Sequence, residues 1–214
     1  SRSRPPVKNA SSSARSQARR YELVWVDRSG RESVVDSGFT FRVTQFAGNH
    51  GWALSPDGSR LAIGLSTPSG DDVWIKQLPG GPVSRVTYGD RPESRPRWTA
   101  DGRSVTAVGA DGAILRRSDG TGTDSLLWRG TVDEALLSPD GRWLLLRMGA
   151  RAATSGVRDI FGLRLGVDTA LTPLLATPYD ENALTLSPDG RWLAYESDET
   201  GRIEVFIRPF PNTG

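Results

Sequence analysis

Short apolar runs recur along the chain from Tyr21 onward, and polar or turn-forming residues separate them. The runs are only four to seven residues long and are rich in Val, Leu, Ile and Trp. Glycine, proline, aspartate and serine fall in the intervals between them. Runs of this length, bounded by turn residues, indicate β-strands rather than helices. We therefore expect an all-β chain in which helix is scarce.

A four-residue turn motif occurs four times, with the sequence SPDG in three copies and TADG in the other. The copies lie at 55–58, 99–102, 138–141 and 187–190, and their glycines are 44, 39 and 49 residues apart. Proline presets φ in such a turn, aspartate can bond nearby amides, and glycine adopts the positive φ that closes the turn. Each copy should join the first two strands of a repeated unit. A repeat of 40–50 residues is typical of one blade of a β-propeller.

Each turn is followed by further strand-like segments. The predicted second strands are 60–65, 104–108, 143–146 and 192–195; the third strands are 72–78, 113–117, 159–165 and 204–210; the outer strands are 83–88, 125–129 and 171–176. With the strand before the turn, this gives four strands per unit, as a propeller blade requires. A hairpin of 21–27 and 32–36 resembles strands three and four of one more blade.

The predicted organisation is a flexible basic linker, residues 1–20, followed by a β-propeller, residues 21–214. Within the propeller we expect a half-blade and connection at 21–47, blades at 48–88, 89–130 and 131–177, and an incomplete blade at 178–214. About four to five blades are thus present. We interpret the chain as an incomplete six-bladed propeller with open sheet edges. The alternative is that the two ends pair and close a small ring.

Composition excludes several kinds of chemistry. The chain of 214 residues has no cysteine and one histidine, His50, so thiolate or multi-histidine metal sites are excluded. Any Ser-His-Asp triad would need His50, for which the sequence fixes no titrating partner nearby. Asp198 and Glu199 could at most hold calcium weakly, and a solvated hairpin tip is the simpler interpretation. We expect no catalytic residue, no metal and no cofactor.

The net charge of +2 comes from the N-terminal segment. Residues 1–20 carry six basic side chains and no acidic one, which leaves residues 21–214 at a formal charge of −4. The segment has little to bury and should be a flexible linker; the alternative is a salt-sensitive contact with an anionic surface. Nucleic acid is not an expected partner of the propeller. With no apolar stretch of 18 residues, we expect the membrane to be reached only through a segment outside this chain.

The innermost strand of a blade lines the central channel, so the loop that enters it should lie at the channel rim. The residues at these positions are Asn49, His50, Trp52, Arg95, Arg97, Asp133, Glu134, Glu181 and Asn182. We expect the two arginines to face the two acidic pairs across the ring. The set could form a pocket for a peptide or small polar ligand; alternatively, its members satisfy one another. The recurring tryptophans, at 74, 98, 143 and 192, should fill space between blades.

The repeat SPDG-R-x-L-A resembles the repeats of TolB-like, WD-like propellers. Two longer stretches, 23–32 (LVWVDRSGRE) and 187–201 (SPDGRWLAYESDETG), with RPFP at 208–211, resemble the propeller found C-terminal to bacterial transmembrane serine/threonine kinases. The likeness covers about residues 21–214. It implies a noncatalytic sensor domain outside the cytoplasm that binds a protein, peptide or small polar ligand. The chain has no Gly-rich phosphate loop, VAIK lysine, HRD or DFG, so the likeness does not extend to kinase activity.

Two other settings use similar repeats. One is the substrate-gating propeller of a prolyl-oligopeptidase-like hydrolase, which would require a catalytic domain with a GxSxG motif. The other is an envelope scaffold of the TolB type, which should be preceded by a secretory signal. In both settings the propeller performs no chemistry itself.

Overall fold

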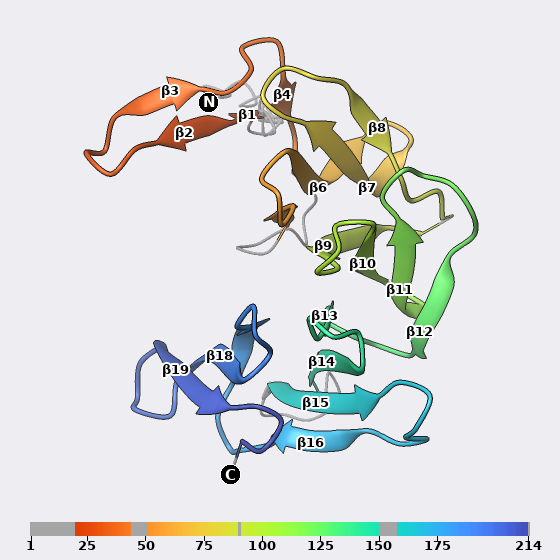
Figure 1. The fold of residues 1–214 in the computed structure, drawn as a ribbon, viewed down its shortest axis with the longest axis vertical. Helices are drawn as coiled ribbons and strands as arrows, with labels where there is room; N and C mark the ends of the chain where they lie inside the picture. Colours follow the sequence, from red (N-terminus) through yellow and green to blue (C-terminus); the bar gives the residue numbers. More distant parts are fainter. Residues whose placement is uncertain (1–19, 44–50, 90, 150–157, 214) are drawn as a thin grey trace, which may run out of the picture.

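The described part of the chain consists of strands and their connections and contains no helix. The computed structural model describes residues 20–43, 51–89, 91–149 and 158–213. Its small antiparallel sheets follow one another around an arc (Figure 1). The all-β, propeller-like arrangement expected from the sequence is therefore confirmed. Within these residues, no helix is long and apolar enough to cross a membrane.

Three of the sheets have four strands each, hydrogen-bonded in chain order. The first contains β5 (Trp52–Leu54), β6 (Arg60–Thr67), β7 (Gly70–Gln77) and β8 (Val83–Arg85). The second contains β9 (Glu93–Trp98), β10 (Ser104–Gly109), β11 (Gly112–Arg117) and β12 (Ser125–Arg129). The third contains β13 (Glu134–Leu137), β14 (Trp143–Gly149), β15 (Arg158–Arg164) and β16 (Thr172–Leu175). We refer to these sheets as blades 1, 2 and 3.

Blade 4 has three strands in the described residues. They are β17 (Asn182–Leu186), β18 (Trp192–Ser197) and β19 (Glu204–Pro209). The outer strand predicted at 83–88 ends at Arg85, because the amides of Val86 and Thr87 both point to the carbonyl of Val73 and break the ladder register. The Thr87 hydroxyl then accepts a hydrogen bond from the Val73 amide.

The turn motif folds as its residue types predict. In the blade 1 copy, Asp57 accepts hydrogen bonds from the Ser55 hydroxyl (2.6 Å) and the Ser59 amide (3.0 Å). The Ser55 oxygen in turn accepts from the amide of Arg60. The same bonds recur in the other three copies, with Thr99 in place of serine in blade 2. The four glycines have φ between 64° and 72°, which confirms their predicted role.

The N-terminal segment packs on the face of blade 1 that is turned away from blade 2. It contains β1 (Tyr21–Glu22), β2 (Val24–Val26), β3 (Glu32–Val34) and β4 (Thr40–Phe41). The hairpin predicted here is shorter than expected, and β1 pairs with β4, a pairing that the sequence did not predict. Phe39 and Phe41 pack against a cluster around Ile63. Asp36 forms an ion pair of 2.5 Å with the buried Lys76, so this segment is held by both apolar and ionic contacts.

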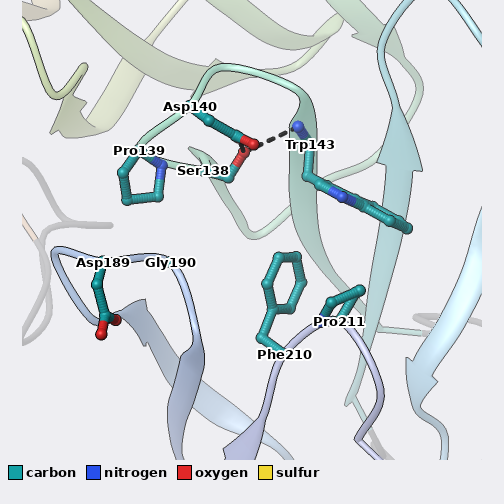
Figure 2. A pocket seen from close by; sticks show the side chains of 8 residues that line it. All are labelled: Ser138, Pro139, Asp140, Trp143, Asp189, Gly190, Phe210 and Pro211. Carbon is teal, nitrogen blue, oxygen red and sulfur yellow. Dashed lines mark hydrogen bonds between the residues drawn. The ribbon is translucent and has the colours of Figure 1, made fainter.

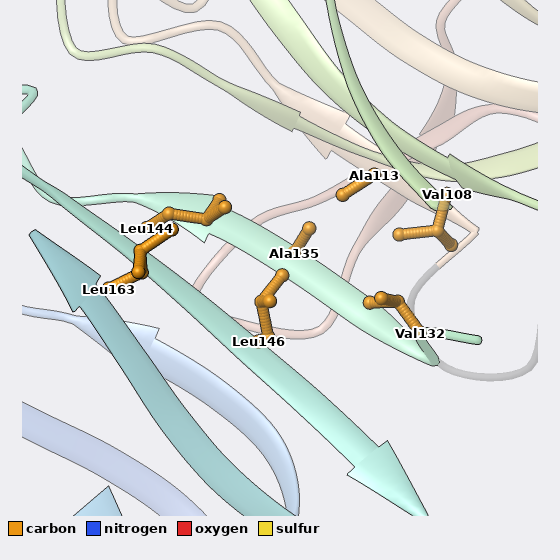
Figure 3. Packing of buried hydrophobic residues seen from close by; sticks show 7 residues of the cluster. All are labelled: Val108, Ala113, Val132, Ala135, Leu144, Leu146 and Leu163. Atoms are coloured by element: carbon orange, nitrogen blue, oxygen red, sulfur yellow. The ribbon is translucent and has the colours of Figure 1, made fainter. Parts of the chain in front are cut away.

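The hydrophobic core lies between blades rather than within one layer. Figure 3 shows the cluster in which Val108 and Ala113 of blade 2 meet Ala135, Leu144 and Leu146 of blade 3. Similar clusters join blade 1 to blade 2 and blade 3 to blade 4. Blades 1, 2 and 3 therefore bury apolar side chains on both faces, and the sequences of their central strands are nearly continuous apolar runs for that reason.

The tryptophans fill space between blades only in part. Trp98 packs against the cluster between blades 1 and 2, and Trp143 against the cluster between blades 3 and 4. Trp74 packs beside the cluster under the N-terminal segment. Trp192 differs, because its side chain is exposed on the outward face of blade 4. No further blade covers that face in the described residues.

The two ends of the arc lie apart in the structure. The β2–β3 hairpin projects at one end and blade 4 lies at the other (Figure 1). In the described residues β2 and β3 pair only with each other, and β19 pairs only with β18. Val205 and Ile207 on β19 are 69% and 65% exposed. Pairing of the two ends into a closed ring is thus not seen in this part of the chain.

Candidate functional site

Most of the predicted rim residues that the structure describes lie near the start of the innermost strands of successive blades. Arg95 and Arg97 are on β9, Asp133 and Glu134 are at the start of β13, and Asn182 opens β17 directly after Glu181. Trp52 opens β5 and is exposed. Asn49 and His50 lie outside the described residues, so their predicted place at the rim is untested. The six charged or amide residues among the others form two environments, described in turn.

The centre of the site is a buried ion pair between Glu134 and Arg147. The Arg147 Nε donates to the Glu134 carboxylate at 2.9 Å, and the two side chains are only 4% and 2% exposed. Arg97 approaches the other oxygen of Glu134 at 3.5 Å from the neighbouring blade. Glu134 therefore lies between two guanidinium groups, one from its own blade and one from the adjacent blade.

Arg158 at the start of β15 connects this pair to a more exposed group of charges. Its guanidinium donates to Asp180 and to the side-chain oxygen of Asn182, both at 3.2 Å. The same Asn182 oxygen accepts a hydrogen bond of 3.0 Å from Arg147. Asp133 lies 3.8 Å from Arg158 on the other side. Five side chains therefore form one hydrogen-bonded network at the rim, and Asp133 joins it through an ion pair. The five are Glu134, Arg147, Arg158, Asp180 and Asn182.

Arg95 joins the network through a local break in strand β9. Its φ is +55°, and the register of β9 with β10 shifts between Thr106 and Val108. Such a bulge redirects a side chain, and here the Arg95 guanidinium donates to the carbonyl oxygen of Asp133. Burial, reinforced by the nearby positive Arg147, lowers the pKa of Arg95. β17 repeats the device at Ala183, where φ is +53°.

Glu181 belongs to a separate, buried environment. Its side chain is inaccessible to solvent and accepts a hydrogen bond from the Thr177 hydroxyl. Burial raises the pKa of Glu181, and the nearby Asp159 adds to the shift. Glu93, at the equivalent position in blade 2, shows the same behaviour, with Thr87 as its hydroxyl partner. Both glutamates lie at the connection into an innermost strand, where Glu181 is fully buried and Glu93 partly buried.

The structure corrects one expectation about the rim. Arg95 and Arg97 do not face the acidic pairs across the ring; they contact Asp133 and Glu134 of the adjacent blade. Adjacent blades bring their inner strands closer together than opposite blades do, so charge pairing occurs between neighbours. The expectation that the residues satisfy one another describes most of the network.

Sequence reasoning missed three members of the network: Arg147, Arg158 and Asp180. A usable signal was present for Arg147, because it lies directly opposite Glu134 in the pairing of β13 with β14. Opposite charges at directly paired positions are a recurrent stabilising feature of antiparallel sheets. Arg158 follows residues that the structure does not describe, and no periodicity marked it in advance.

The accessible part of the network carries charges of both signs. Its exposed groups are one guanidinium, two carboxylates and an amide, held by bonds to their neighbours. Among the described residues no three His, Cys, Asp or Glu side chains are grouped so that they could hold a metal ion. A ligand with groups of both signs could exchange its own charges for the internal pairs.

Comparison with known proteins gives one curated relative and several solved propellers. The chain is 32% identical over 129 residues to Tricorn protease homolog 1 of Streptomyces coelicolor, a match that covers 56% of this chain and 12% of that protein. No family model matches the chain. The chain thus spans a small fraction of the curated relative.

The similar solved structures include two TolB proteins. TolB from Acinetobacter baumannii has a TM-score of 0.65 at 20% identity, covering 87% of this chain and 45% of that one. A putative TolB from Agrobacterium tumefaciens has a TM-score of 0.64 at 19% identity, covering 90% and 78%. At these identities the likeness concerns the fold alone. With the four blades described above, it shows that the fold of this chain is that of a TolB-like β-propeller.

Proposed function

We propose that this chain is a noncatalytic recognition module that binds a protein or peptide at the rim formed by Asp133, Arg158, Asp180 and Asn182. The supporting observation is the partly exposed ion network on these residues. The side chains of Arg158, Asp133 and Asp180 are 42%, 34% and 32% exposed. Ion pairs this accessible contribute little to stability. A ligand can therefore replace them at small cost, while the buried Glu134–Arg147 pair keeps the backbone in place.

The setting that the sequence favours is the sensor part of a bacterial receptor-type serine/threonine kinase, outside the cytoplasm. It rests on the likeness of residues 23–32 and 187–201 to such propellers. In this setting the division into blades at 48–88, 89–130 and 131–177 places one rim loop before each inner strand. A small polar ligand would use the same groups as a peptide, with fewer contacts.

Capture from an envelope extract tests the proposal. The immobilised chain, its Arg158→Ala variant and a control Arg117→Ala variant are each exposed to the extract, and captured proteins are quantified by mass spectrometry. Arg117 also forms an ion pair at 2.8 Å, with Asp119, but at the opposite end of the strands. We expect a protein that the wild type and Arg117→Ala retain and that Arg158→Ala loses. Identical capture by all three proteins would refute binding at the rim.

A second candidate setting is the propeller of a peptidase, favoured by the 129-residue match to Tricorn protease homolog 1. There the rim would contact peptide on its way to catalytic residues in another domain. The rest of the gene distinguishes the settings: a kinase domain with a membrane span supports the sensor, and a peptidase domain supports the gating role. A secretory signal without either domain supports an envelope scaffold of the TolB type.

A further inference from the structure

A second concave site lies at the other end of the inner strands, between the turn motifs of blades 3 and 4. It has a volume of about 390 Å³. Figure 2 shows Pro139 above the turn that carries Asp189 and Gly190, with the Phe210 ring beside them. The rim described above lies where the inner strands begin, whereas these turns lie where they end. The groove is therefore separate from the rim site.

The equivalent space between blades 1 and 2 is filled by an arginine of the protein itself. Arg60 of blade 1 reaches across to blade 2 and donates to the carbonyl of Gly102 at 2.7 Å and to the Ser118 hydroxyl at 3.0 Å. Its guanidinium carbon lies 4.6 Å from the centre of the Trp98 ring, a distance typical of a cation–π contact. The groove between these turns thus recognises a guanidinium group.

Backbone bonds show that the two spaces are equivalent. Gly102 and Gly190 occupy the same turn position, and each lies against a proline of the preceding blade, Pro56 and Pro139 respectively. The Ser118 amide donates to the carbonyl of Arg103, the residue after Gly102. The Phe210 amide likewise donates to the carbonyl of Arg191, the residue after Gly190. Phe210 therefore takes the place of Ser118 in the second groove.

In the second groove the side chain at the arginine position is Trp143, which lines the groove without filling it. Trp143 follows its turn at the same spacing as Arg60, but its ring lies against Gly162 of β15. The contact is so close that a Cβ added to Gly162 would lie 3.1 Å from the ring carbons. The ring also contacts Phe210 edge-on, with centroids 5.6 Å apart. In the described residues no side chain donates to the Gly190 carbonyl. Gly190, whose carbonyl corresponds to the acceptor that Arg60 uses in the first groove, lines this groove.

The groove carries negative charge at its edges. Asp140 and Asp189 line it, and hydrogen bonds from Ser138 and Ser187 respectively are the main cause of their lowered pKa values. Each carboxylate forms an ion pair with the arginine two residues later in the chain, at 3.8 Å between Asp140 and Arg142 and 2.7 Å between Asp189 and Arg191. Those arginines are about four-fifths exposed and held in solvent, where such pairs are weak.

We propose that the groove between blades 3 and 4 binds an arginine side chain of a partner protein or peptide. The guanidinium would donate to the Gly190 carbonyl, as Arg60 does to Gly102, and would pack on the Phe210 ring. Asp140 and Asp189 supply the compensating charge. Arginine fits better than lysine, because its planar group can donate hydrogen bonds in its plane and stack on a ring at once.

A labelled tripeptide amide, fluorescein-Gly-Arg-Gly, tests the proposal by fluorescence anisotropy, with citrulline in place of arginine as the neutral twin. We expect the arginine peptide to bind at least fivefold more tightly than the citrulline peptide. Asp189→Asn should weaken binding of the arginine peptide about fivefold, since the amide keeps the turn bonds and loses the charge. The matched control Asp101→Asn, at the same turn position in blade 2, should leave the affinity unchanged.

Trp143→Arg provides an independent test, because an arginine there can occupy the groove as Arg60 occupies its own. It should lower the peptide affinity at least fivefold while circular dichroism shows that the chain is still folded. If Trp143→Arg unfolds the chain, the comparison of Asp189→Asn with Asp101→Asn still tests the proposal. Arg158→Ala should bind the peptide normally. Equal affinities for the arginine and citrulline peptides, equal effects of Asp189→Asn and Asp101→Asn, or loss of binding in Arg158→Ala would each overturn the proposal. The last result would place the peptide at the rim instead.

Discussion

Replacing Arg147 with methionine should destabilise the chain by about 4 kcal/mol. Methionine keeps much of the length of the side chain but leaves the Glu134 carboxylate, 2% exposed, without its partner at 2.9 Å. Removing one member of a buried pair costs about 3–5 kcal/mol, because the remaining charge is uncompensated. Arg97 remains 3.5 Å from Glu134, which places the expected cost at the lower end. The lost bond to Asn182 adds about 1 kcal/mol.

Urea unfolding, followed by tryptophan fluorescence, measures this cost. The double variant Arg147→Met/Glu134→Leu should recover about half of the loss, since it removes the buried charge together with its partner. Arg117→Met is the matched control: it also breaks an arginine–aspartate pair on a strand, but both of its side chains are about half exposed. That pair should contribute less than about 1 kcal/mol.

Two results would refute this reasoning. If Arg147→Met and Arg117→Met destabilise the chain equally, the buried pair has no special weight. If the double variant loses more unfolding free energy than Arg147→Met and Glu134→Leu lose together, the two residues contribute through packing rather than through their charges. A parallel change in the denaturant slope would show that the variant alters the surface exposed on unfolding.

Three further predictions concern single positions. Asp189 has a pKa of about 2, below its unfolded value near 4, so its contribution to stability is lost as the pH falls from about 4 to 2; Asp189→Asn should flatten the stability profile in that window. Gly112→Ala should cost at least about 3 kcal/mol, because its Cβ would lie 1.9 Å from the Trp128 carbonyl, whereas Gly30→Ala should cost about 1 kcal/mol from φ alone. Burial raises the pKa of Glu181, so the fold loses stability as the pH rises above the pKa that this glutamate has in the unfolded chain. In thermal unfolding, Glu181→Gln should be more stable than the wild type at pH 7 and no different at pH 4.

Most of the blade architecture could be predicted because each blade is determined locally. The turn motif fixes one hairpin through bonds within five residues, as at Ser55–Asp57 and Ser55–Arg60. The β1–β4 pairing escaped prediction for the opposite reason. Its strands have two residues each and are held by contacts of Phe41 with blade 1. A pattern within so short a segment cannot indicate such a contact.

The rim could be predicted only as a set of candidate positions. Placing loops before inner strands selected Arg95, Asp133 and Asn182 as candidates, and the structure links these three residues through Arg158 and the Asp133 carbonyl. It could not distinguish them from Glu181, which precedes Asn182 by one residue yet is fully buried. Neighbouring residues of an extended segment point to opposite sides, and the bulge at Ala183 that follows them shifts the register of β17 with β18. A bulge in an alanine-containing strand has no clear mark in the sequence.

The four copies of the turn also separate positions that maintain the fold from positions that can vary with function. The hydroxyl, aspartate and glycine recur in every copy, since each completes a bond or a φ value that the hairpin needs. The residue five places after the hydroxyl is constrained only through its amide, which bonds back to that hydroxyl. Its side chain is free to differ, and it is Arg60, Ser104, Trp143 and Trp192 in the successive blades. Arg60 closes one inter-blade groove and Trp143 leaves another open, so a single variable position in a repeated turn determines which groove is available to a partner.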